Sequence, residues 1–308
     1  MRPLRIGARG SLLAKWQAEF VRKRLFSAAG VEAEIVVIKT SGDKFANAPV
    51  TQIGGKGIFV KELEDALLDE SIDVAVHSVK DIPTEIHSRL SFPAVFRRED
   101  VRDCLISATG ATLANLRQGA RIGTGSLRRQ SQLRHLRPDL DVRDLRGNVD
   151  TRLRKAQSGE YDAILLAKAG LDRLGWSDRI AEVFSPDVFL PAVGQGAIAA
   201  QCRLSDNEAA DVLGALDDAE SRAAIIAERS LLAALQGGCQ VPIGAWARSE
   251  HGEFVLEACV CSVDGSQYVR QRATAPPEQA AALGEHVARL LFESGGQAIL
   301  EAVRAQHG

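Results

Sequence analysis

The same strand-and-turn pattern occurs twice in this chain. The run Arg5-Ile6-Gly7-Ala8 is repeated as Arg121-Ile122-Gly123-Thr124, and each copy is followed within a few residues by a serine, a leucine and a predicted helix. Ile72-Asp73-Val74-Ala75-Val76 is likewise repeated as Tyr161-Asp162-Ala163-Ile164-Leu165. In the first copy, strands expected at 4–8, 32–38 and 72–76 alternate with helices at 11–28 and 58–69. This order predicts a parallel, doubly wound sheet, so the sequence predicts two tandem α/β domains.

The order of the predicted elements also gives the domain boundaries. We expect a first α/β domain over residues 1–97, with a return segment at about 197–216, and a second over residues 102–193. Residues 219–308 are predicted to form a small α+β domain, with a helix, three strands at about 241–248, 253–263 and 266–274, and helices from about 277. Residues 40–57 carry four glycines and no apolar periodicity. They are predicted to form a mobile loop, long enough to act as a lid.

Composition excludes several classes of protein. The 308 residues are 45% apolar and 25% charged, which is typical of a soluble globular protein. The net charge of −2 gives no general attraction to nucleic acid or to an anionic membrane. The start of the chain does not resemble a signal peptide and no apolar run is long enough to span a membrane, so a cytoplasmic protein is expected. Five cysteines without a C-x-x-C pair or a histidine cluster argue against zinc or a disulfide framework, and Cys259 and Cys261 are interpreted as packing residues.

One cysteine has an unusual setting. Cys239 lies in the run Leu235-Gln236-Gly237-Gly238-Cys239-Gln240-Val241-Pro242, directly after a predicted helix. The glycines allow the helix to end and Pro242 prevents it from resuming, so the thiol is expected on an accessible turn. A buried, purely apolar role is the alternative, and this context alone does not decide between the two.

Two strand-to-helix turns are candidate anion sites. Ser11 and Ser126 each begin a predicted helix, where free N–H groups and the helix dipole favour a carboxylate or phosphate. Simple helix capping by serine explains either turn alone. The stretch from Arg117 to Arg154, however, holds ten arginines, no lysine and four acids. Because arginine binds carboxylates in a bidentate manner, the two turns together favour binding of an anion.

A third candidate is the run His77-Ser78-Val79-Lys80-Asp81, which follows a predicted strand and therefore lies at the same edge of the sheet. Lys80 and Asp81 could form a solvated ion pair of little consequence. The position favours instead a carboxylate that stabilises a cation or moves a proton. The glycine runs at 54–57 and 194–196 match neither a Walker A motif nor G-x-G-x-x-G, so nucleotide binding is not supported.

These motifs together resemble the porphobilinogen deaminase (hydroxymethylbilane synthase) family of tetrapyrrole biosynthesis. The resemblance runs nearly end to end, through Arg9-Gly10-Ser11, Thr40-Ser41-Gly42-Asp43, Gly54 to Leu63, His77 to Pro83, Ser126 to Gln130, Leu145 to Asn148 with Thr151-Arg152, Gly194 to Ala197, and Gly238 to Pro242. The family fold is similar to that of two-lobed periplasmic binding proteins. The resemblance therefore implies a transferase of porphyrin and heme biosynthesis whose C-terminal domain anchors a cofactor.

The resemblance also implies a cofactor and a set of site residues. A dipyrromethane, made from two substrate molecules, would be bound through a thioether to Cys239, and four porphobilinogen units would be added head to tail with loss of ammonia before water releases the product. The growing chain carries two carboxylates per ring, which explains the arginines. Cofactor-binding residues would be Ser78, Lys80, Asp81, Thr124, Ser126, Arg128, Arg129, Arg146, Gly147 and Cys239. Substrate-binding residues would be Arg9, Ser11, Phe59, Arg152, Arg173 and Gln195, with no metal.

Asp81 is the expected catalytic residue. Loss of ammonia from the substrate gives an azafulvenium-type cation, which an ionised carboxylate bound to pyrrole N–H groups would stabilise. Two positions depart from the family pattern: Gly125 stands where many relatives have a second serine, and Asp150 places an acid beside the arginine-rich stretch. Both affect only the expected carboxylate contacts.

Two other functions remain as alternatives. A non-enzymatic two-lobed solute-binding protein would share the α/β halves, but it would need neither Cys239 nor the third domain. An RNA-binding module could use the arginines, but no aromatic residue lies between Arg97 and Lys155 to stack on bases. We therefore expect porphobilinogen as a small-molecule substrate, no nucleic-acid or membrane partner, and a monomer.

Overall fold

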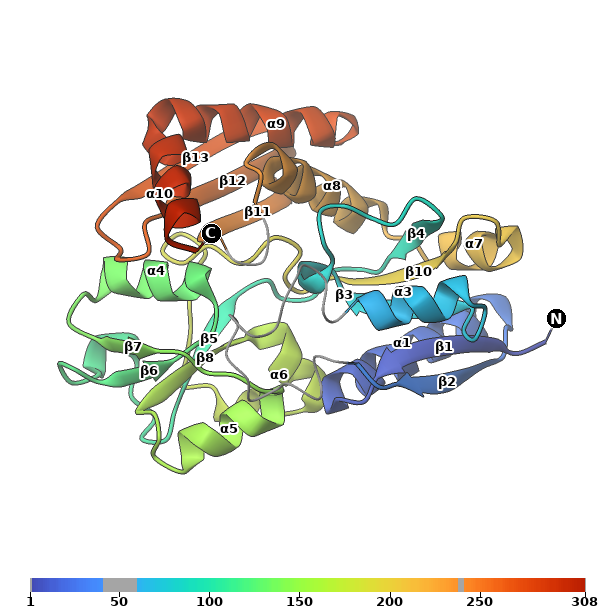
Figure 1. Ribbon diagram of the computed structural model, residues 1–308, viewed down its shortest axis with the longest axis horizontal. Coiled ribbons are helices and arrows are strands. Elements are labelled where there is room, and N and C mark those ends of the chain that lie inside the picture. Colours follow the sequence, from blue (N-terminus) through green and yellow to red (C-terminus); the bar gives the residue numbers. More distant parts are fainter. Residues whose placement is uncertain (1, 41–59, 238–240, 308) are drawn as a thin grey trace. The chain divides into compact units, whose positions relative to one another are not determined.

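The computed structural model describes residues 2–40, 60–237 and 241–307 (Figure 1). Residues 41–57 of the predicted loop, Phe59 and Cys239 lie outside this part of the chain. The described residues form two compact units: unit 1 contains residues 1–99 and 197–222, and unit 2 contains residues 100–196 and 223–308. The boundary predicted at residue 219 for a separate third domain stays a prediction.

Unit 1 is built on a five-stranded sheet with the order β2-β1-β3-β10-β4. Strands β1, β2 and β3 are parallel, whereas β10 is antiparallel to both β3 and β4. Helices α1 and α7 pack on one face, where Ile6, Val21 and Leu213 share a core, and α3 packs on the other through Leu63 and Leu67. The elements are β1 (Leu4–Arg9), α1 (Leu12–Ala29), β2 (Ala33–Ile38), α3 (Lys61–Leu68), β3 (Val74–Ser78), the short 3₁₀ helix η2 (Val79–Asp81), β4 (Leu90–Val95), β10 (Ile198–Arg203) and α7 (Asn207–Gly214).

Unit 2 contains a second sheet of the same design, with the order β7-β6-β8-β5-β9. Strands β6, β7 and β8 are parallel, and β5 is antiparallel to β8 and β9. Helix α4 contributes Leu133 to the core on one face, and α5 and α6 contribute Leu153 and Leu171 on the other. The elements are β5 (Asp103–Ser107), η3 (Leu113–Asn115), β6 (Arg121–Gly123), α4 (Leu127–Leu136), β7 (Asp141–Arg143), α5 (Val149–Gln157), β8 (Ala163–Ala167), α6 (Lys168–Leu174), η4 (Ser177–Arg179) and β9 (Glu182–Val183).

Unit 2 also holds the C-terminal α+β segment. Its antiparallel sheet β11-β12-β13 is covered on one face by helices, where Leu231, Leu256 and Val287 are fully or almost fully buried. The elements are β11 (Ile243–Glu250), β12 (Glu253–Cys261), β13 (Tyr268–Ala275), η5 (Pro277–Gln279), α9 (Ala280–Leu291), the π-turn η6 (Phe292–Gly296) and α10 (Gln297–His307), preceded by α8 (Ala219–Ala234). The predicted fold class is confirmed: two α/β sheets and a small C-terminal α+β segment.

The turn between β12 and β13 is docked on the C-terminal end of α4. Arg134 Nη1 donates to the Val263 carbonyl over 2.7 Å, and His135 Nδ1 lies 2.9 Å from the Gly265 carbonyl. The His135 ring also stacks on Tyr268, with 4.7 Å between ring centroids. Gly265 has φ +77°, and a Cβ there would lie 2.4 Å from the backbone nitrogen of His135. The docking therefore requires glycine at this position.

One expectation about the sheets needs correction. The β-α-β-α-β order predicts all-parallel sheets, but in each sheet one strand, β10 or β5, runs antiparallel to both of its neighbours, and only the three strands of that order pair in parallel. The remaining strands, β4 and β10 in one sheet and β5 and β9 in the other, come from segments outside that order.

Cys259 and Cys261 are fully buried, in agreement with their predicted packing role. No helix in the described part of the chain has the length and apolarity to cross a membrane.

Candidate functional site

The candidate residues of unit 1 gather at one edge of its sheet. Arg9 ends β1 and Ser78 ends β3, and these strands are parallel neighbours, so their carboxyl ends lie at the same edge. Ser11 caps α1 by accepting the Ala14 N–H over 3.2 Å. Lys80 and Asp81 follow Ser78 in η2. The structure therefore brings Arg9, Ser11, Ser78, Lys80 and Asp81 to one edge.

The β3–η2 turn is fixed from both sides. The amide of Gln17, a buried residue of α1, donates to Ser78 Oγ over 2.8 Å, and the Val79 N–H donates to the Ala197 carbonyl over 3.0 Å. Asp81 is half-buried, and its carboxylate has no hydrogen-bond or ion-pair partner among residues 2–40, 60–237 and 241–307. A rigid turn thus presents an uncommitted carboxylate. Sequence reasoning missed Gln17, which lies in an ordinary helical pattern.

A buried histidine stands directly before this turn. His77 Nε2 lies 2.9 Å from Gln201 Oε1, and the Gln201 amide donates to Glu64 Oε1 over 2.8 Å. Burial lowers the pKa of His77 to about 4, although its hydrogen bond to Gln201 opposes the shift. At neutral pH, His77 is therefore uncharged and acts as a structural hydrogen-bonding group behind the turn.

In unit 2, the predicted residues lie around the carboxyl ends of β6, β7 and β8. Thr124 follows β6 and is fully buried, and Ser126 Oγ accepts the Arg129 N–H over 3.5 Å as the cap of α4. Arg146 and Gly147 follow β7, and Arg152 Nε donates to the Gly147 carbonyl over 2.7 Å. Arg173 in α6 donates to the Gly196 carbonyl over 2.7 Å. Both serines therefore cap helices, and an additional anion-binding role for them stays a prediction.

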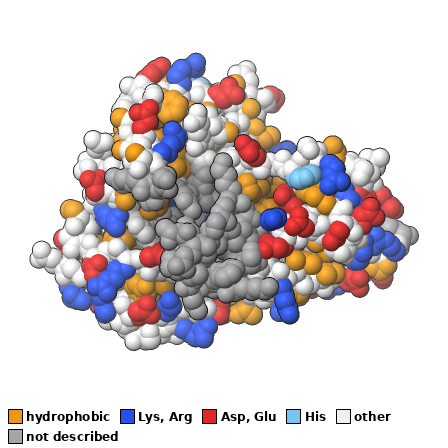
Figure 2. Space-filling model, in the orientation of Figure 1, with side chains coloured by type: hydrophobic (Ala, Val, Ile, Leu, Met, Phe, Trp, Pro, Cys, Tyr) orange, Lys and Arg blue, Asp and Glu red, His pale blue; other side chains and the backbone are white. Residues whose placement is uncertain are grey.

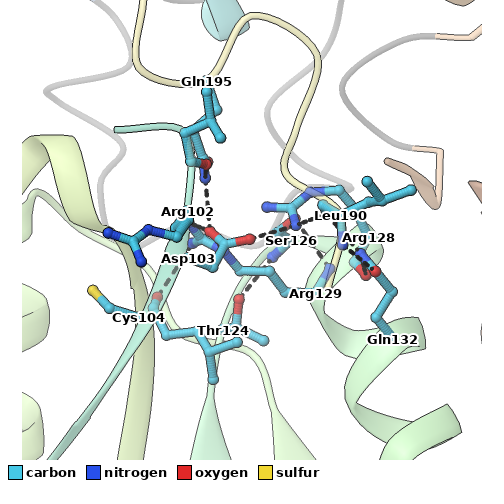
Figure 3. Close-up of polar contacts among 12 residues, drawn as sticks. Arg102, Asp103, Cys104, Thr124, Ser126, Arg128, Arg129, Gln132, Leu190 and Gln195 are labelled. Carbon is cyan, nitrogen blue, oxygen red and sulfur yellow. Dashed lines mark hydrogen bonds and ion pairs between the residues drawn. The ribbon is translucent and has the colours of Figure 1, made fainter. Parts of the chain in front are cut away.

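The centre of this group is a buried aspartate that the sequence did not reveal (Figure 3). Asp103 Oδ2 accepts Arg128 Nη1 over 2.6 Å, and Oδ1 accepts Arg129 Nη2 over 2.7 Å and the Gln195 amide over 3.0 Å. Burial alone would raise the pKa of Asp103, but the guanidiniums of Arg128 and Arg129 outweigh it and hold the pKa well below its usual range. The carboxylate is thus ionised, and the cluster of two arginines and one aspartate has a net charge of +1.

One buried N–H group of this cluster has no acceptor among the described residues. Arg128 is only 4% exposed, and its buried Nε has no hydrogen-bond partner within the described residues. Buried donors are rarely left unpaired in folded proteins, so this atom is available to an acceptor from outside the described part of the chain. An ionised carboxylate is the acceptor that suits a cationic cluster best.

The other arginines of residues 117–154 are less free than the sequence suggested. All four acids of this stretch pair with a nearby arginine, as Arg137–Asp139, Arg143–Asp141, Arg146–Asp144 and Arg154–Asp150. Around β6, β7 and α5, the face drawn in Figure 2 accordingly shows basic and acidic side chains interspersed. Asp150 thus has a local partner. Four of the ten arginines are thus paired within the stretch, Arg117 and Arg121 share Asp162, and the buried cluster around Asp103 keeps a net positive charge.

Gly125 has a physical reason for lacking a side chain. A Cβ at this position would lie 2.9 Å from the Leu145 carbonyl oxygen and 3.0 Å from Asp144 Oδ1. A serine here would need the segment at 144–145 to shift. The departure from the family pattern therefore follows from the close approach of two loops within unit 2.

Comparison with known proteins identifies the family. Residues 4–211 match the family model "Porphobilinogen deaminase, dipyromethane cofactor binding domain", and residues 223–293 match "Porphobilinogen deaminase, C-terminal domain". The chain belongs to the porphobilinogen deaminase family. It is 46% identical over 303 residues to the porphobilinogen deaminase of Syntrophobacter fumaroxidans, covering 98% of both chains. It is 48% identical to that of Trichlorobacter lovleyi, covering 97% of this chain and 96% of the relative.

Similar solved structures include periplasmic proteins. A periplasmic substrate-binding protein of an ABC transporter from Coxiella burnetii aligns with a TM-score of 0.44 and 15% identity, covering 69% of this chain and 91% of the other. An ancestral arginine-binding protein aligns with a TM-score of 0.37 and 16% identity, covering 70% and 91%. Assignment to the porphobilinogen deaminase family rests on the sequence matches, not on these distant likenesses.

Proposed function

We propose that this chain is a hydroxymethylbilane synthase, a transferase that joins four porphobilinogen molecules head to tail with release of four ammonia. The observation that carries this proposal is membership of the porphobilinogen deaminase family over nearly the whole chain. The reaction belongs to porphyrin and heme biosynthesis. The alternative of a non-enzymatic solute-binding protein is not favoured, because the match includes the family's C-terminal domain as well as the α/β part.

The residues of unit 2 suit a cofactor that carries carboxylates. The cluster around Asp103 has a net positive charge in a dry environment, and the unpartnered Nε of Arg128 is a donor for an oxygen. We therefore assign Thr124, Ser126, Arg128, Arg129, Arg146 and Gly147 to cofactor binding, together with Ser78, Lys80 and Asp81 of unit 1. When bound, the dipyrromethane supplies the free pyrrole carbon to which the first substrate is joined.

Cys239 is proposed as the point of attachment. The four cysteines that the structure describes are buried and free, and burial raises the pKa of each thiol, to about 12 for Cys104 and Cys261. Such thiols are poor nucleophiles at neutral pH. Cys239 follows α8 on a glycine-rich segment, and that setting supports a reactive thiol.

Asp81 is proposed as the catalytic residue. Its carboxylate is uncommitted within the described residues and lies on a turn held by Gln17 and the Ala197 carbonyl. An ionised carboxylate there can accept pyrrole N–H groups and stabilise the cation that develops when the substrate loses ammonia. It can also carry a proton to the departing amine. Arg9, Ser11, Phe59, Arg152, Arg173 and Gln195 are proposed to bind the substrate's acetate and propionate groups.

Intact-mass measurement tests this proposal directly. The full-length protein should carry a covalent adduct of two pyrrole units, and peptide mapping should place it on Cys239. A Cys239→Ser protein should lack the adduct and make no hydroxymethylbilane. A solute-binding protein or an RNA-binding module would show the unmodified mass for both forms, and that result would refute the proposal.

We also propose that the protein is a cytoplasmic monomer. The four free, buried thiols of the described residues are consistent with a reducing compartment. Light scattering at micromolar concentration should give a mass near the 33.1 kDa of one chain. A mass of twice that value would contradict the monomer.

A further inference from the structure

Asp103 joins three residues that come from distant parts of the chain. It is the first residue of β5 and is fully buried, whereas Arg128 and Arg129 lie in the first turn of α4 and Gln195 precedes β10. Each partner is one that we assign to cofactor or substrate binding. Figure 3 shows the three side chains converging on the one carboxylate.

The two arginines would not converge without a common acceptor. Adjacent residues of an α-helix point about 100° apart, because one turn takes 3.6 residues. Two guanidiniums at close range also repel each other, most strongly where water is excluded. Asp103 offsets both effects, because its Oδ2 accepts a hydrogen bond from Arg128 Nη1 and its Oδ1 accepts from both Nε and Nη2 of Arg129. Arg128 Nη1 also donates to the Leu190 carbonyl over 2.8 Å and Arg129 Nη1 to the Leu165 carbonyl over 3.2 Å, so the pair is held on several sides, and the buried Nε of Arg128 is left without an acceptor among the described residues.

The network extends to the helix that precedes Cys239. Gln195 also donates to the Val101 carbonyl over 2.7 Å, which fixes its amide beside Asp103. The adjacent Gly194 N–H donates over 2.7 Å to Glu228, a fully buried residue of α8. Glu228 in turn accepts the Ala247 N–H of β11 over 2.8 Å. Buried hydrogen bonds made by the adjacent residues 194 and 195 therefore connect α8 to the carboxylate that holds the arginine pair.

We propose that Asp103 is a positioning residue, which holds the guanidiniums of Arg128 and Arg129 in the one arrangement that receives a cofactor carboxylate. The proposal rests on the function proposed above and assigns to this function a residue that acts through Arg128 and Arg129. Because a misplacement of about 1 Å can cost about 100-fold in rate, the position of the carboxylate matters as well as its charge.

The test is the rate at which the full-length apo-protein acquires its cofactor. Protein produced in cells that make no porphobilinogen is given porphobilinogen, and intact mass is followed until two pyrrole units have been added. Asp103→Asn, which is uncharged and keeps only one accepting oxygen, should load about 100-fold more slowly than wild type. Asp103→Glu keeps the charge but moves the carboxylate by about 1.5 Å, and should load about 10-fold more slowly. Loading of either folded variant at the wild-type rate would overturn the proposal.

Asp73→Asn is the matched control. Asp73 is also a buried aspartate with several arginine partners, Arg2, Arg5 and Arg203, but it lies at the opposite edge of the sheet of unit 1 from Asp81. This variant should lose stability and still load at the wild-type rate. If it loads as slowly as Asp103→Asn, slow loading follows from instability and the proposal fails. If Asp103→Asn does not fold, Asp103→Glu decides the test. Failure of wild type to load would refute the proposed function instead.

Discussion

Asp73 binds Arg5 through both backbone and side chain: its Oδ2 accepts the Arg5 N–H over 2.9 Å and Arg5 Nε over 3.1 Å. Asp162 binds Arg121 in the same way, with its Oδ2 accepting the backbone N–H over 2.7 Å and Nε over 3.2 Å. Each pair joins equivalent parallel strands, since Ile6 lies opposite Val74 and Ile122 lies opposite Ala163. The repeat inferred from the sequence is therefore a structural repeat, and its arginines and aspartates hold corresponding strands in register.

The glycines that follow these arginines should not tolerate a methyl group. A Cβ on Gly7 would lie 2.3 Å from Ile72 Cδ1, and a Cβ on Gly123 would lie 2.8 Å from Cδ1 of the Tyr161 ring. Gly7→Ala and Gly123→Ala should each lower the free energy of unfolding by about 1–3 kcal/mol. Gly214 ends α7 with nothing within 4 Å of its Cβ position, so Gly214→Ala is the control and should be neutral or stabilising. Urea denaturation measures all three, and a neutral Gly123→Ala would contradict the expected clash.

The docking of the β12–β13 turn on α4 can be isolated by a pair of glycines. Gly265 and Gly252 both have positive φ, +77° and +84°, and both lie in hairpin turns of the same sheet. An alanine at Gly252 meets no atom within 4 Å, so Gly252→Ala measures only the backbone cost of about 1 kcal/mol. Gly265→Ala adds a clash with the backbone of α4 and should cost about 2 kcal/mol more. Chemical denaturation measures the free energy of unfolding of both variants. If Gly252→Ala and Gly265→Ala lower it equally, the docking contributes nothing to stability.

His77 should make stability depend on pH in a defined window. Because burial lowers its pKa to about 4, the unfolded chain binds a proton below about pH 6.5 while the folded protein does not. The neutral His77 therefore contributes fully to the free energy of unfolding above pH 6.5. This contribution falls by about 3 kcal/mol as the pH is lowered from 6.5 to 4. Denaturation of wild type and His77→Gln from pH 7 to 4 checks this. The difference in free energy of unfolding between the two proteins should change by this amount over that range. If their free energies of unfolding follow parallel curves against pH, the histidine is not buried and neutral.

Asp81→Asn should separate cofactor attachment from turnover. The amide keeps the shape of the side chain but cannot stabilise a developing cation, so production of hydroxymethylbilane should fall by about 10²–10⁴-fold. The intact mass should still show the two-pyrrole adduct. Asp211→Asn, an exposed acid of α7 in the same unit, should keep the wild-type rate. Normal turnover by Asp81→Asn would remove this residue from the catalytic role.

Local signals predicted most of the fold. Apolar runs and the turn residues between them predicted the strands and helices of the first repeat and of the C-terminal segment to within a few residues. In the second repeat they predicted only the segments of β6, α4 and β8. The antiparallel strands were harder, because pairing is decided in three dimensions. Leu90–Val95 has an apolar sequence, but its place beside β10 depends on a partner more than 100 residues later in the chain.

Some residues of the site could be predicted from the sequence and others could not. Residues that follow strands, such as Ser78, Asp81 and Arg128, could be proposed from sequence position and family resemblance. Asp103 could not be proposed in this way, because the residues that it binds lie 25, 26 and 92 positions away in the sequence and no motif surrounds it. The one available signal is that an acid begins the apolar strand Asp103–Ser107, where a charge needs partners. Phe59 and Cys239 lie outside the described residues, so their roles stay predictions.

The position of β10 has a consequence for synthesis on the ribosome. All five strands of the β7-β6-β8-β5-β9 sheet in unit 2 come from one continuous stretch, residues 103–183. The sheet of unit 1, in contrast, needs β10 at residues 198–203 between β3 and β4. Until that segment leaves the exit tunnel, β4 has no neighbour and the edge of β3 stays open. The sheet translated second can thus be completed first, and the N-terminal half of the nascent chain must wait, with an exposed strand edge, for a chaperone or for its missing strand.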